Sequence, residues 1–467
     1  MGFGIVDWAL LALYLVLMVA VGVYFKTTDT LSDYTVADSK LDLSVLSATL
    51  LATAIGGGAL IGNVGTSYSS GIIMLPQVAV LTLINLFMGV FVAKKVRSIG
   101  GFTAPEMLGR VYGKRCQALG GIFCGIYMIG TGPAMQSIGL GTCIHLLLGV
   151  DLRLAMIIGM AIILFYTFSS GMWGVVMTDY IQYIFLSLGV ILVAIFVYQD
   201  AGGWTNIAAN LPPKYLQVNT TNMLRLVCSM AFPVMIDGNR YARFFSAKDA
   251  DTARKATLIA VIPQTVNNLL LVVIGLAAVG LLAPNTPKDM VFSTLLMEYL
   301  PAGIKGLCVA ALMAAIMSTA DSYMLTGATN FSVDIYKTYI NPNATDKQML
   351  KVTKYGSLTV GLVGLGWAIL FPDVVGIWTL SATAYVAGCL VPMLYGMFSS
   401  GKKSYLAATI SMIGGGAVAL ICDINHIVIF NLPAIVYGII ISAILLLVIT
   451  QFASDAKYVD IANGKVE

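Results

Sequence analysis

Residues 48–68 read ATLLATAIGGGALIGNVGTSY, and this stretch gives the first indication of the fold. The stretch is apolar and about as long as a helix that crosses a bilayer core, which takes about 20 residues. Gly56, Gly57 and Gly58 stand in a row at its middle, and each glycine costs a helix about 1 kcal/mol relative to alanine. The pattern predicts a membrane helix broken near its midpoint, where free carbonyls can coordinate an ion. Close helix packing through small residues is the alternative interpretation.

The composition of the chain agrees with a membrane location. Of 467 residues, 58% are apolar and only 10% are charged, whereas soluble domains carry about 25% charged residues. A soluble enzyme and a disordered chain are therefore excluded. A net charge of +4 with scattered basic residues argues against nucleic-acid binding. The seven cysteines form no C-x-x-C pair, so we expect neither a zinc site nor a disulfide framework.

Long apolar runs recur along almost the entire chain and predict an all-α integral membrane protein with 13 transmembrane helices. The runs are continuous rather than alternating, which argues against a β-barrel. We expect a single membrane transport domain over residues 1–467 with a short tail over 453–467. The predicted spans are 4–25, 43–68, 71–93, 116–148, 154–170, 172–198, 222–243, 256–283, 300–333, 355–371, 373–399, 404–422 and 427–452.

The distribution of Lys and Arg predicts the orientation in the cell membrane. With the N-terminus outside, 21 of the 26 basic residues, Lys26 among them, fall on the cytoplasmic side together with the C-terminus. The first span lacks a basic n-region, so we do not expect it to be a cleaved signal peptide. The five exceptions are Arg153, Lys214, Arg225, Lys288 and Lys305.

Three acidic residues fall inside predicted spans, namely Asp179, Asp237 and Asp321. A charge inside the membrane costs several kcal/mol and usually marks a functional site. Arg240 lies three residues from Asp237, so a local ion pair is one interpretation there. No Lys or Arg lies deep enough to neutralise all three acids, and carboxylates without protein partners imply a bound cation or a proton.

The ninth span adds further oxygen ligands next to Asp321. Its sequence AALMAAIMSTADSYMLTGATNFSVDIYK, residues 310–337, places Ser318, Asp321 and Ser322 on one helical face, with Thr319 one residue round. Hydroxyls that hydrogen-bond neighbouring helices are the structural alternative. Carboxylate, hydroxyl and carbonyl oxygens suit a hard cation such as Na⁺. The two histidines, His145 and His426, lie near span ends, where we expect interfacial or structural roles.

Several stretches together resemble the sodium/solute symporter family over roughly residues 5–400. The branch that looks most similar is the choline transporters, through the AT..GGG pattern of the second span and the ADS of the ninth. The stretches are LSDYTVADSKL at 31–41, GMWGVVMTDYIQ at 171–182, RFFSAKDADTARKA at 243–256, AAIMSTADS at 314–322 and DIYK at 334–337.

The resemblance implies a leucine-transporter-type fold with a 5+5 inverted repeat and a broken first helix in each repeat. The extra N-terminal span would be 4–25, the first repeat 43–198, the second repeat 222–399, and the two C-terminal spans 404–452.

The resemblance also implies two cation sites. The main sodium site would use the backbone carbonyls of Ala52, Ile55 and Ala315 with the hydroxyls of Ser318 and Thr319. A second cation site would use Asp179, Ser318, Asp321 and Ser322. Many relatives carry a hydroxyl residue where this chain has Asp321, so a proton is an alternative occupant.

Solute-contact positions of the family fall on six residues of this chain, and one of them is acidic. The aromatic residues that surround a quaternary ammonium in choline transporters fall at Ala54 and Asp237, so a cation–π cage is not supported. An acid at this position favours a cationic or donor-rich solute. The six positions are Gly56, Ala59, Gln77, Gln136, Asp237 and Gln264.

The predicted function is sodium-coupled symport of a small polar organic solute into the cell by alternating access. The expected partners are that solute, sodium ions and the lipid bilayer; the oligomeric state stays open. Proton coupling through Asp179 or Asp321 is the main alternative. A channel or solute sensor on the same fold is another, although the polar residues cluster at one depth rather than along a pore. We see no constellation of catalytic residues.

Overall fold

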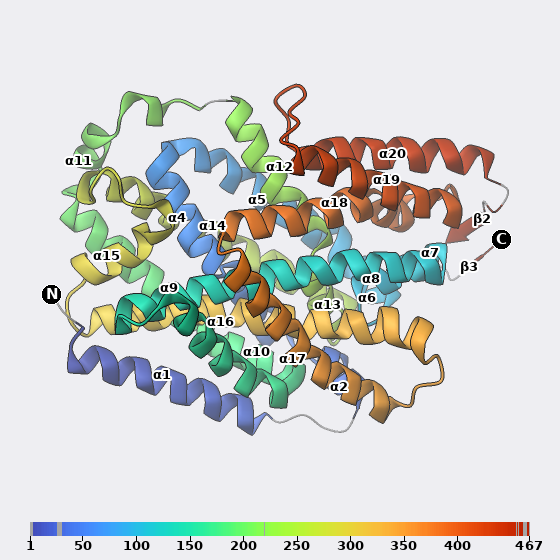
Figure 1. Ribbon diagram of the computed structural model, residues 1–467, viewed down its shortest axis with the longest axis horizontal. Helices are drawn as coiled ribbons and strands as arrows, with labels where there is room; N and C mark the ends of the chain where they lie inside the picture. Colours follow the sequence, from blue (N-terminus) through green and yellow to red (C-terminus); the bar gives the residue numbers. More distant parts are fainter. Residues whose placement is uncertain are drawn as a thin grey trace.

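The described chain is helical almost throughout. The computed structural model describes residues 3–25, 30–218, 220–453, 455, 457–460 and 465–466. Lys26 lies outside these residues, as does part of the predicted tail 453–467. Most of the long helices run roughly along the long axis of the molecule (Figure 1).

The first half of the chain forms eleven α-helices with short 3₁₀ and π segments between some of them. They are α1 (Ile5–Tyr24), α2 (Leu31–Val36), η1 (Ala37–Ser39), α3 (Leu43–Ala54), α4 (Gly57–Ser70), η2 (Gly71–Ile73), α5 (Met74–Phe87), η3 (Met88–Val92), α6 (Ala93–Ile99), α7 (Ala104–Tyr112), α8 (Lys114–Ile129), η4 (Gly130–Ala134), α9 (Met135–Leu148), α10 (Leu152–Asp200) and α11 (Gly203–Asn210).

The second half continues in the same way and ends in a small antiparallel sheet of order β1-β2-β3. Its elements are η5 (Pro213–Leu216), α12 (Thr220–Ile236), α13 (Gly238–Ser246), α14 (Ala250–Leu281), η6 (Lys288–Met290), α15 (Val291–Tyr299), α16 (Ile304–Asn330), η7 (Phe331–Ile340), α17 (Asp346–Leu370), α18 (Val374–Phe398), β1 (Lys402–Lys403), α19 (Tyr405–Ile424), α20 (Ala434–Phe452), β2 (Lys457–Asp460) and β3 (Lys465–Val466).

Nine helical stretches of the described chain are long and apolar enough to cross a membrane. The protein is therefore a multi-pass membrane protein, but this number does not confirm the predicted count of thirteen. Part of the difference lies in the stretch Gly57–Ile99, which is counted once although it covers parts of the predicted spans 43–68 and 71–93. The predicted boundary between 154–170 and 172–198 falls inside α10, where the backbone leaves the helical conformation at Gly171 (φ 57°, ψ −158°). Such a positive φ favours glycine.

Two helices are interrupted within the bundle. The first break separates α3 from α4 at Ile55 and Gly56, as the sequence predicted, and the second separates α12 from α13 at Asp237. The two breaks fall in the first helices of the two predicted repeats. Each one leaves helix-end carbonyls and N–H groups without helical partners inside the protein.

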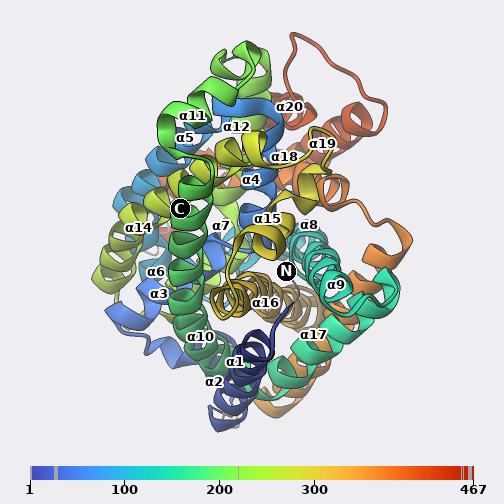
Figure 2. The same cartoon turned by 90° about the vertical axis from the view of Figure 1, so that its left-hand side faces the viewer.

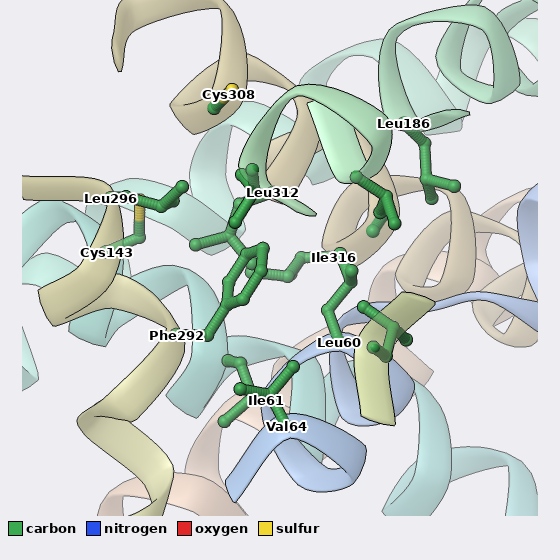
Figure 3. Packing of buried hydrophobic residues seen from close by; sticks show 14 of the residues in the cluster. Leu60, Ile61, Val64, Cys143, Leu186, Phe292, Leu296, Cys308, Leu312 and Ile316 are labelled. Atoms are coloured by element: carbon green, nitrogen blue, oxygen red, sulfur yellow. The ribbon is translucent and has the colours of Figure 1, made fainter. Parts of the chain in front are cut away.

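Helix α16 lies near the centre of the bundle. Viewed nearly end-on, it has α1, α9, α10, α15 and α17 around it (Figure 2). Every residue from Cys308 to Asn330 is buried. Its first half packs in an apolar core, where Leu312 and Ile316 lie among side chains of α4, α10 and α15 (Figure 3).

Helix α1 is attached to the beginning of α16 by one buried carboxylate. Asp7 Oδ1 accepts hydrogen bonds from the backbone N–H groups of Gly303 at 2.7 Å and Gly306 at 2.6 Å. A negative charge is favourable at a helix N-terminus. The extra N-terminal helix is thereby held against the same helix that carries the predicted sodium ligands.

Candidate ion and solute site

The three consecutive glycines let α4 approach its neighbours without side chains between them. A Cβ atom on Gly56 would lie 2.1 Å from Thr319 Oγ1, and one on Gly57 would lie 2.4 Å from Ile316 Cγ1. A Cβ on Gly58 would lie 2.0 Å from Met135 Cε. Gly56 has φ −70°, which any residue can adopt. Gly56 is therefore needed because it lets the start of α4 lie close to Thr319 of α16. The helix is broken at this segment and also packs closely through its small residues, so both interpretations hold.

The predicted sodium ligands meet where α3 ends against α16. Ser318 Oγ donates to the carbonyl oxygens of Ala315 at 3.1 Å and Ala52 at 3.3 Å, and the latter contact crosses between the helices. Thr319 Oγ1 donates to Ala315 O at 3.0 Å. Ile55 is fully buried at the break itself. The structure thus brings together Ala52 O, Ala315 O and the hydroxyls of Ser318 and Thr319, four of the five groups that the family resemblance assigns to sodium.

A buried arginine lies beside this oxygen cluster. Arg243 of α13 is 1% exposed, and its Nη2 lies 2.9 Å from Asp179 Oδ2 of α10. Nη2 also donates to Ser322 Oγ at 2.7 Å and Thr53 Oγ1 at 2.6 Å, while Nε donates to Thr49 Oγ1 at 2.9 Å. One guanidinium therefore links α3, α10, α13 and α16.

The expectation that Asp179 lacks a protein partner is wrong. Arg243, which the sequence places toward one end of its span, reaches inward to neutralise Asp179, and Thr49 Oγ1 donates to the same Asp179 oxygen at 2.5 Å. The structure brings Asp179 and Ser322 together through Arg243 rather than around an open space. Asp321, the third predicted acid, is fully buried on α16.

Asp237 occupies the break between α12 and α13, and both of its carboxylate oxygens accept hydrogen bonds from the protein. Oδ1 accepts from the backbone N–H of Asn239 at 3.0 Å and Oδ2 accepts from the Tyr323 hydroxyl at 2.9 Å. Arg240 donates instead to Asn85 Oδ1 at 2.5 Å. Among the described ion pairs, the local Asp237–Arg240 pair is not formed.

The other predicted solute positions lie on helices around the first break. Gln136 is 2% exposed, its Oε1 would lie 2.9 Å from a Cβ on Gly57, and its Nε2 donates to Thr131 O at 3.2 Å. Gln77 is likewise 2% exposed on α5. Gln264 is buried on α14, and Ala59 lies on the first turns of α4. These side chains line the packed interior, but no single described cavity joins all six predicted positions.

Sequence reasoning missed the residues that connect the two breaks. Thr49 and Thr53 are spaced i, i+4 on α3, a spacing that puts both hydroxyls on one helical face and could have revealed them. Tyr127 lies with its ring centroid 6.1 Å from that of Tyr323 and 5.3 Å from that of Tyr385. An aromatic cluster therefore adjoins Asp237, and its three tyrosines come from α8, α16 and α18. They do not occupy positions 54 and 237, where the choline transporters carry aromatic residues.

Two helices broken inside the membrane, facing a buried hydroxyl-rich helix, define a secondary transporter rather than an enzyme. Comparison with known families agrees: residues 34–415 match the model of the sodium:solute symporter family. The chain belongs to the sodium:solute symporter family.

Known relatives are transporters of different solutes. The sodium/glucose cotransporter of Vibrio parahaemolyticus is 26% identical over 424 residues, covering 80% of this chain and 76% of that protein. High affinity choline transporter 1 of Homo sapiens is 26% identical over 381 residues, covering 76% of this chain but only 65% of that protein.

Solved structures show the fold. A Na⁺-coupled sialic acid symporter in a substrate-bound outward-open state matches with a TM-score of 0.85 at 18% identity, covering 98% of this chain and 100% of that chain. Mhp1, a nucleobase-cation-symport-1 family transporter in a closed conformation, matches with a TM-score of 0.56 at 14% identity, covering 90% and 94%. The leucine-transporter-type fold predicted from the sequence is confirmed.

Proposed function

We propose that this protein couples the inward flow of sodium to the uptake of a small polar organic solute by alternating access. Sodium would bind the carbonyls of Ala52, Ile55 and Ala315 with the hydroxyls of Ser318 and Thr319. The observation that carries the proposal is the position of Ser318 Oγ on α16, 3.3 Å from Ala52 O near the end of α3 and 3.1 Å from Ala315 O. The sodium/glucose cotransporter and the Na⁺-coupled sialic acid symporter are named for sodium coupling, which supports the same ion.

Coupling follows from where the ion would sit. Sodium between the end of α3 and the middle of α16 stabilises the conformation in which these helices touch, and destabilises any conformation that separates them. An ion shifts a conformational equilibrium only through its different affinity for the two states. By linkage, solute and sodium then strengthen each other's binding. No covalent step is needed.

The second predicted cation would now have fewer free ligands. Arg243 supplies a positive charge to Asp179 and a hydrogen bond to Ser322, two of the four predicted groups. We therefore propose one sodium ion at the main site as the minimal coupling scheme. The other two predicted groups of that site are Ser318, which also belongs to the main site, and Asp321.

The solute class follows from the side chains near the breaks. Gln77, Gln136 and Gln264 offer amide donors and acceptors, and Asp237 offers carboxylate lone pairs beyond the two hydrogen bonds it already accepts. We propose a solute rich in hydroxyl or amine donors. The tyrosines next to Asp237 would favour a cationic amine over a neutral polyol.

Uptake into proteoliposomes tests the proposal. Purified protein is assayed with candidate amines, amino acids, sugars and carboxylates under an inward gradient of Na⁺ or of K⁺. We expect uptake of one class only with Na⁺, and strongly reduced sodium dependence in Ser318→Ala. Thr329→Ala is the matched control, because its hydroxyl lies on the same helix and donates only to its own turn, at Leu325 O, 2.8 Å away. Equal uptake in Na⁺ and K⁺, or an unchanged sodium response in Ser318→Ala, would overturn the proposal.

A further inference from the structure

A large apolar cavity lies away from the ion site, between α8, the α16–η7 helix and α17. Its volume is about 710 Å³, within the range of about 300–1,000 Å³ that is typical of ligand pockets. The wall from α8 includes Ile122, Ile126 and Ile129, and the opposite wall from α17 includes Val352 and Val363. The cavity therefore offers a hydrocarbon surface long enough to follow several helical turns.

Glycines create this hollow. Gly125 of α8 lines it, and a Cβ atom there would meet nothing within 4 Å. Gly121, Gly327 and Gly356 line it as well, where the helices come closer together. A leucine at position 125 would extend into the cavity, so the hollow depends on the missing side chain.

The cavity opens toward the face that the helices present to lipid. Phe331 and Tyr355 line it and are 43% and 56% exposed, and Ile122 on the opposite wall is 48% exposed. Large exposed apolar side chains at a helical face of a membrane protein contact acyl chains. An occupant can therefore enter sideways from the bilayer without crossing the protein.

One end of the cavity is basic. Lys351 lines it on the first turns of α17, and Lys347 and Lys354 follow the same helical face at i−4 and i+3. Lys347 and Lys351 are exposed, whereas Lys354 lies over the ring of Tyr34 at 5.4 Å. Two acids on η7 and at the start of α17 form hydrogen bonds with other residues: Asp334 Oδ1 accepts from Thr103 at 2.8 Å and Gln117 at 2.9 Å, and Asp346 Oδ2 accepts from the N–H of Leu31 at 3.0 Å.

We propose that this groove is a binding site for an anionic phospholipid, with one acyl chain between α8 and α17 and its phosphate beside Lys351. Basic pockets between membrane helices bind anionic lipid head groups, and the apolar wall starts directly below the lysines. A zwitterionic lipid would fill the same hydrocarbon space but would lack the net negative charge that Lys347 and Lys351 attract. A lipid held between α8 and α17 would also contact Gly327 on α16, the helix that carries Ser318 and Thr319.

Native mass spectrometry of the detergent-solubilised protein tests the site without any transport assay. Phosphatidylglycerol and phosphatidylcholine with identical acyl chains are titrated separately. We expect one phosphatidylglycerol to bind more tightly than phosphatidylcholine, and Gly125→Leu to remove this bound lipid. Gly366→Leu is the matched control, since Gly366 also has nothing within 4 Å on α17 but does not line the cavity.

The Lys351→Gln variant distinguishes the contribution of the lipid head group to binding from that of the acyl chain. Because Lys351 is exposed, the variant should fold, and a single lysine at a lipid surface is worth about fivefold in affinity. We expect the preference for phosphatidylglycerol to fall by about this factor while phosphatidylcholine binding stays constant. Equal binding of both lipids by the unchanged protein, or full phosphatidylglycerol binding by a folded Gly125→Leu variant, would overturn the proposal.

Discussion

Arg243 Nη2 and Asp179 Oδ2 lie 2.9 Å apart, with side chains that are 1% and 0% exposed. The guanidinium also donates hydrogen bonds to side-chain oxygens of four residues, namely Thr49, Thr53, Ser322 and Asn239. The pair therefore joins α13 to α10 and, through the hydroxyls, to α3 and α16, the two helices that meet at the proposed sodium site. Any motion that separates α3 or α13 from α10 and α16 must break these contacts or carry them along.

Substituting only one residue of this ion pair should strongly destabilise the fold. Removing one partner of a buried ion pair destabilises a protein by about 3–5 kcal/mol, because the other charge remains buried and unpaired. We expect Asp179→Asn and Arg243→Gln each to lower the free energy of unfolding by an amount of this order. The double variant should lose less than the sum of the two. Thermal denaturation of the four proteins in one detergent measures the coupling.

The exposed pair between Lys94 and Asp251 provides the comparison for that cycle. Its atoms are also 2.9 Å apart, but the two side chains are 53% and 63% exposed. Exposed pairs contribute about 0–1 kcal/mol. A coupling energy at Arg243–Asp179 no larger than that at Lys94–Asp251 would show that the buried pair does not hold the helices together.

The close approach of α4 to α16 predicts a sharp difference between two glycines of the same helix. In Gly56→Ala the new Cβ would lie 2.1 Å from Thr319 Oγ1, so the side chain of this proposed ligand must move. In Gly62→Ala nothing lies within 4 Å of the new Cβ. We expect Gly56→Ala to raise the sodium concentration for half-maximal uptake by about tenfold or more, since an overpacked site costs about 1–3 kcal/mol.

The Gly62→Ala variant should retain the parent's sodium response. Sodium-dependent uptake in proteoliposomes, measured over a range of Na⁺ concentrations at fixed ionic strength, gives both values. Equal half-saturation in the two variants would contradict the assignment of Thr319 to the ion site, because only Gly56 faces that hydroxyl.

Local composition was sufficient to predict the break in the second span and the hydroxyl-rich face of the ninth, whereas the meeting of the two spans was predicted through the family resemblance. Glycines in an apolar helix and hydroxyls on one helical face are visible in short windows. The pairing of Arg243 with Asp179 was not predictable in this way. It joins residues 64 positions apart, and the depth that an arginine reaches depends on how α13 turns after the break at Asp237.

The boundary between the predicted spans 154–170 and 172–198 coincides with a break in the helical backbone at Gly171 (φ 57°, ψ −158°). The full number of spans was harder to predict, and the count of thirteen is not confirmed by the nine stretches of the described chain that are long and apolar enough to cross a membrane. Asp237 shows a further limit, since the family resemblance indicated a solute contact while its place at a helix start also makes it a cap.

Asp237→Asn tests which of these two roles dominates. Asparagine caps helices as well as aspartate does, so Oδ1 should still accept from Asn239 N–H, and only the charge is removed. We expect solute binding to weaken by about tenfold or more, the value of a lost charge-assisted hydrogen bond of about 1.5–3 kcal/mol, with sodium affinity nearly unchanged. Thermal-shift titrations of solute and of Na⁺ measure the two affinities separately. A larger loss for sodium than for solute would assign Asp237 a structural role at the break.

The dependence of uptake on pH distinguishes sodium from proton coupling. The pKa values of Asp38, Asp42 and Asp249, outside the membrane helices, are lowered by hydrogen bonds from Lys40, from the Val45 N–H and from the Thr252 N–H. A carboxylate with a lowered folded pKa stabilises the fold above its unfolded pKa of about 3.9 and loses this contribution only as the pH falls through the lower folded value. These three groups therefore stay ionised from pH 6 to 8.

With sodium as the coupling ion, we expect initial uptake at saturating Na⁺ to change by less than about twofold from pH 8 to pH 6. The measurement uses a variant with His145→Gln and His426→Gln, so that the protein contains no histidine. Its sodium response at pH 7.5 is compared with that of the parent protein to show that the substitutions are neutral. Uptake that rises steeply as the pH falls, and that persists when Na⁺ is replaced by K⁺, would instead assign the coupling to a proton on a buried acid such as Asp321.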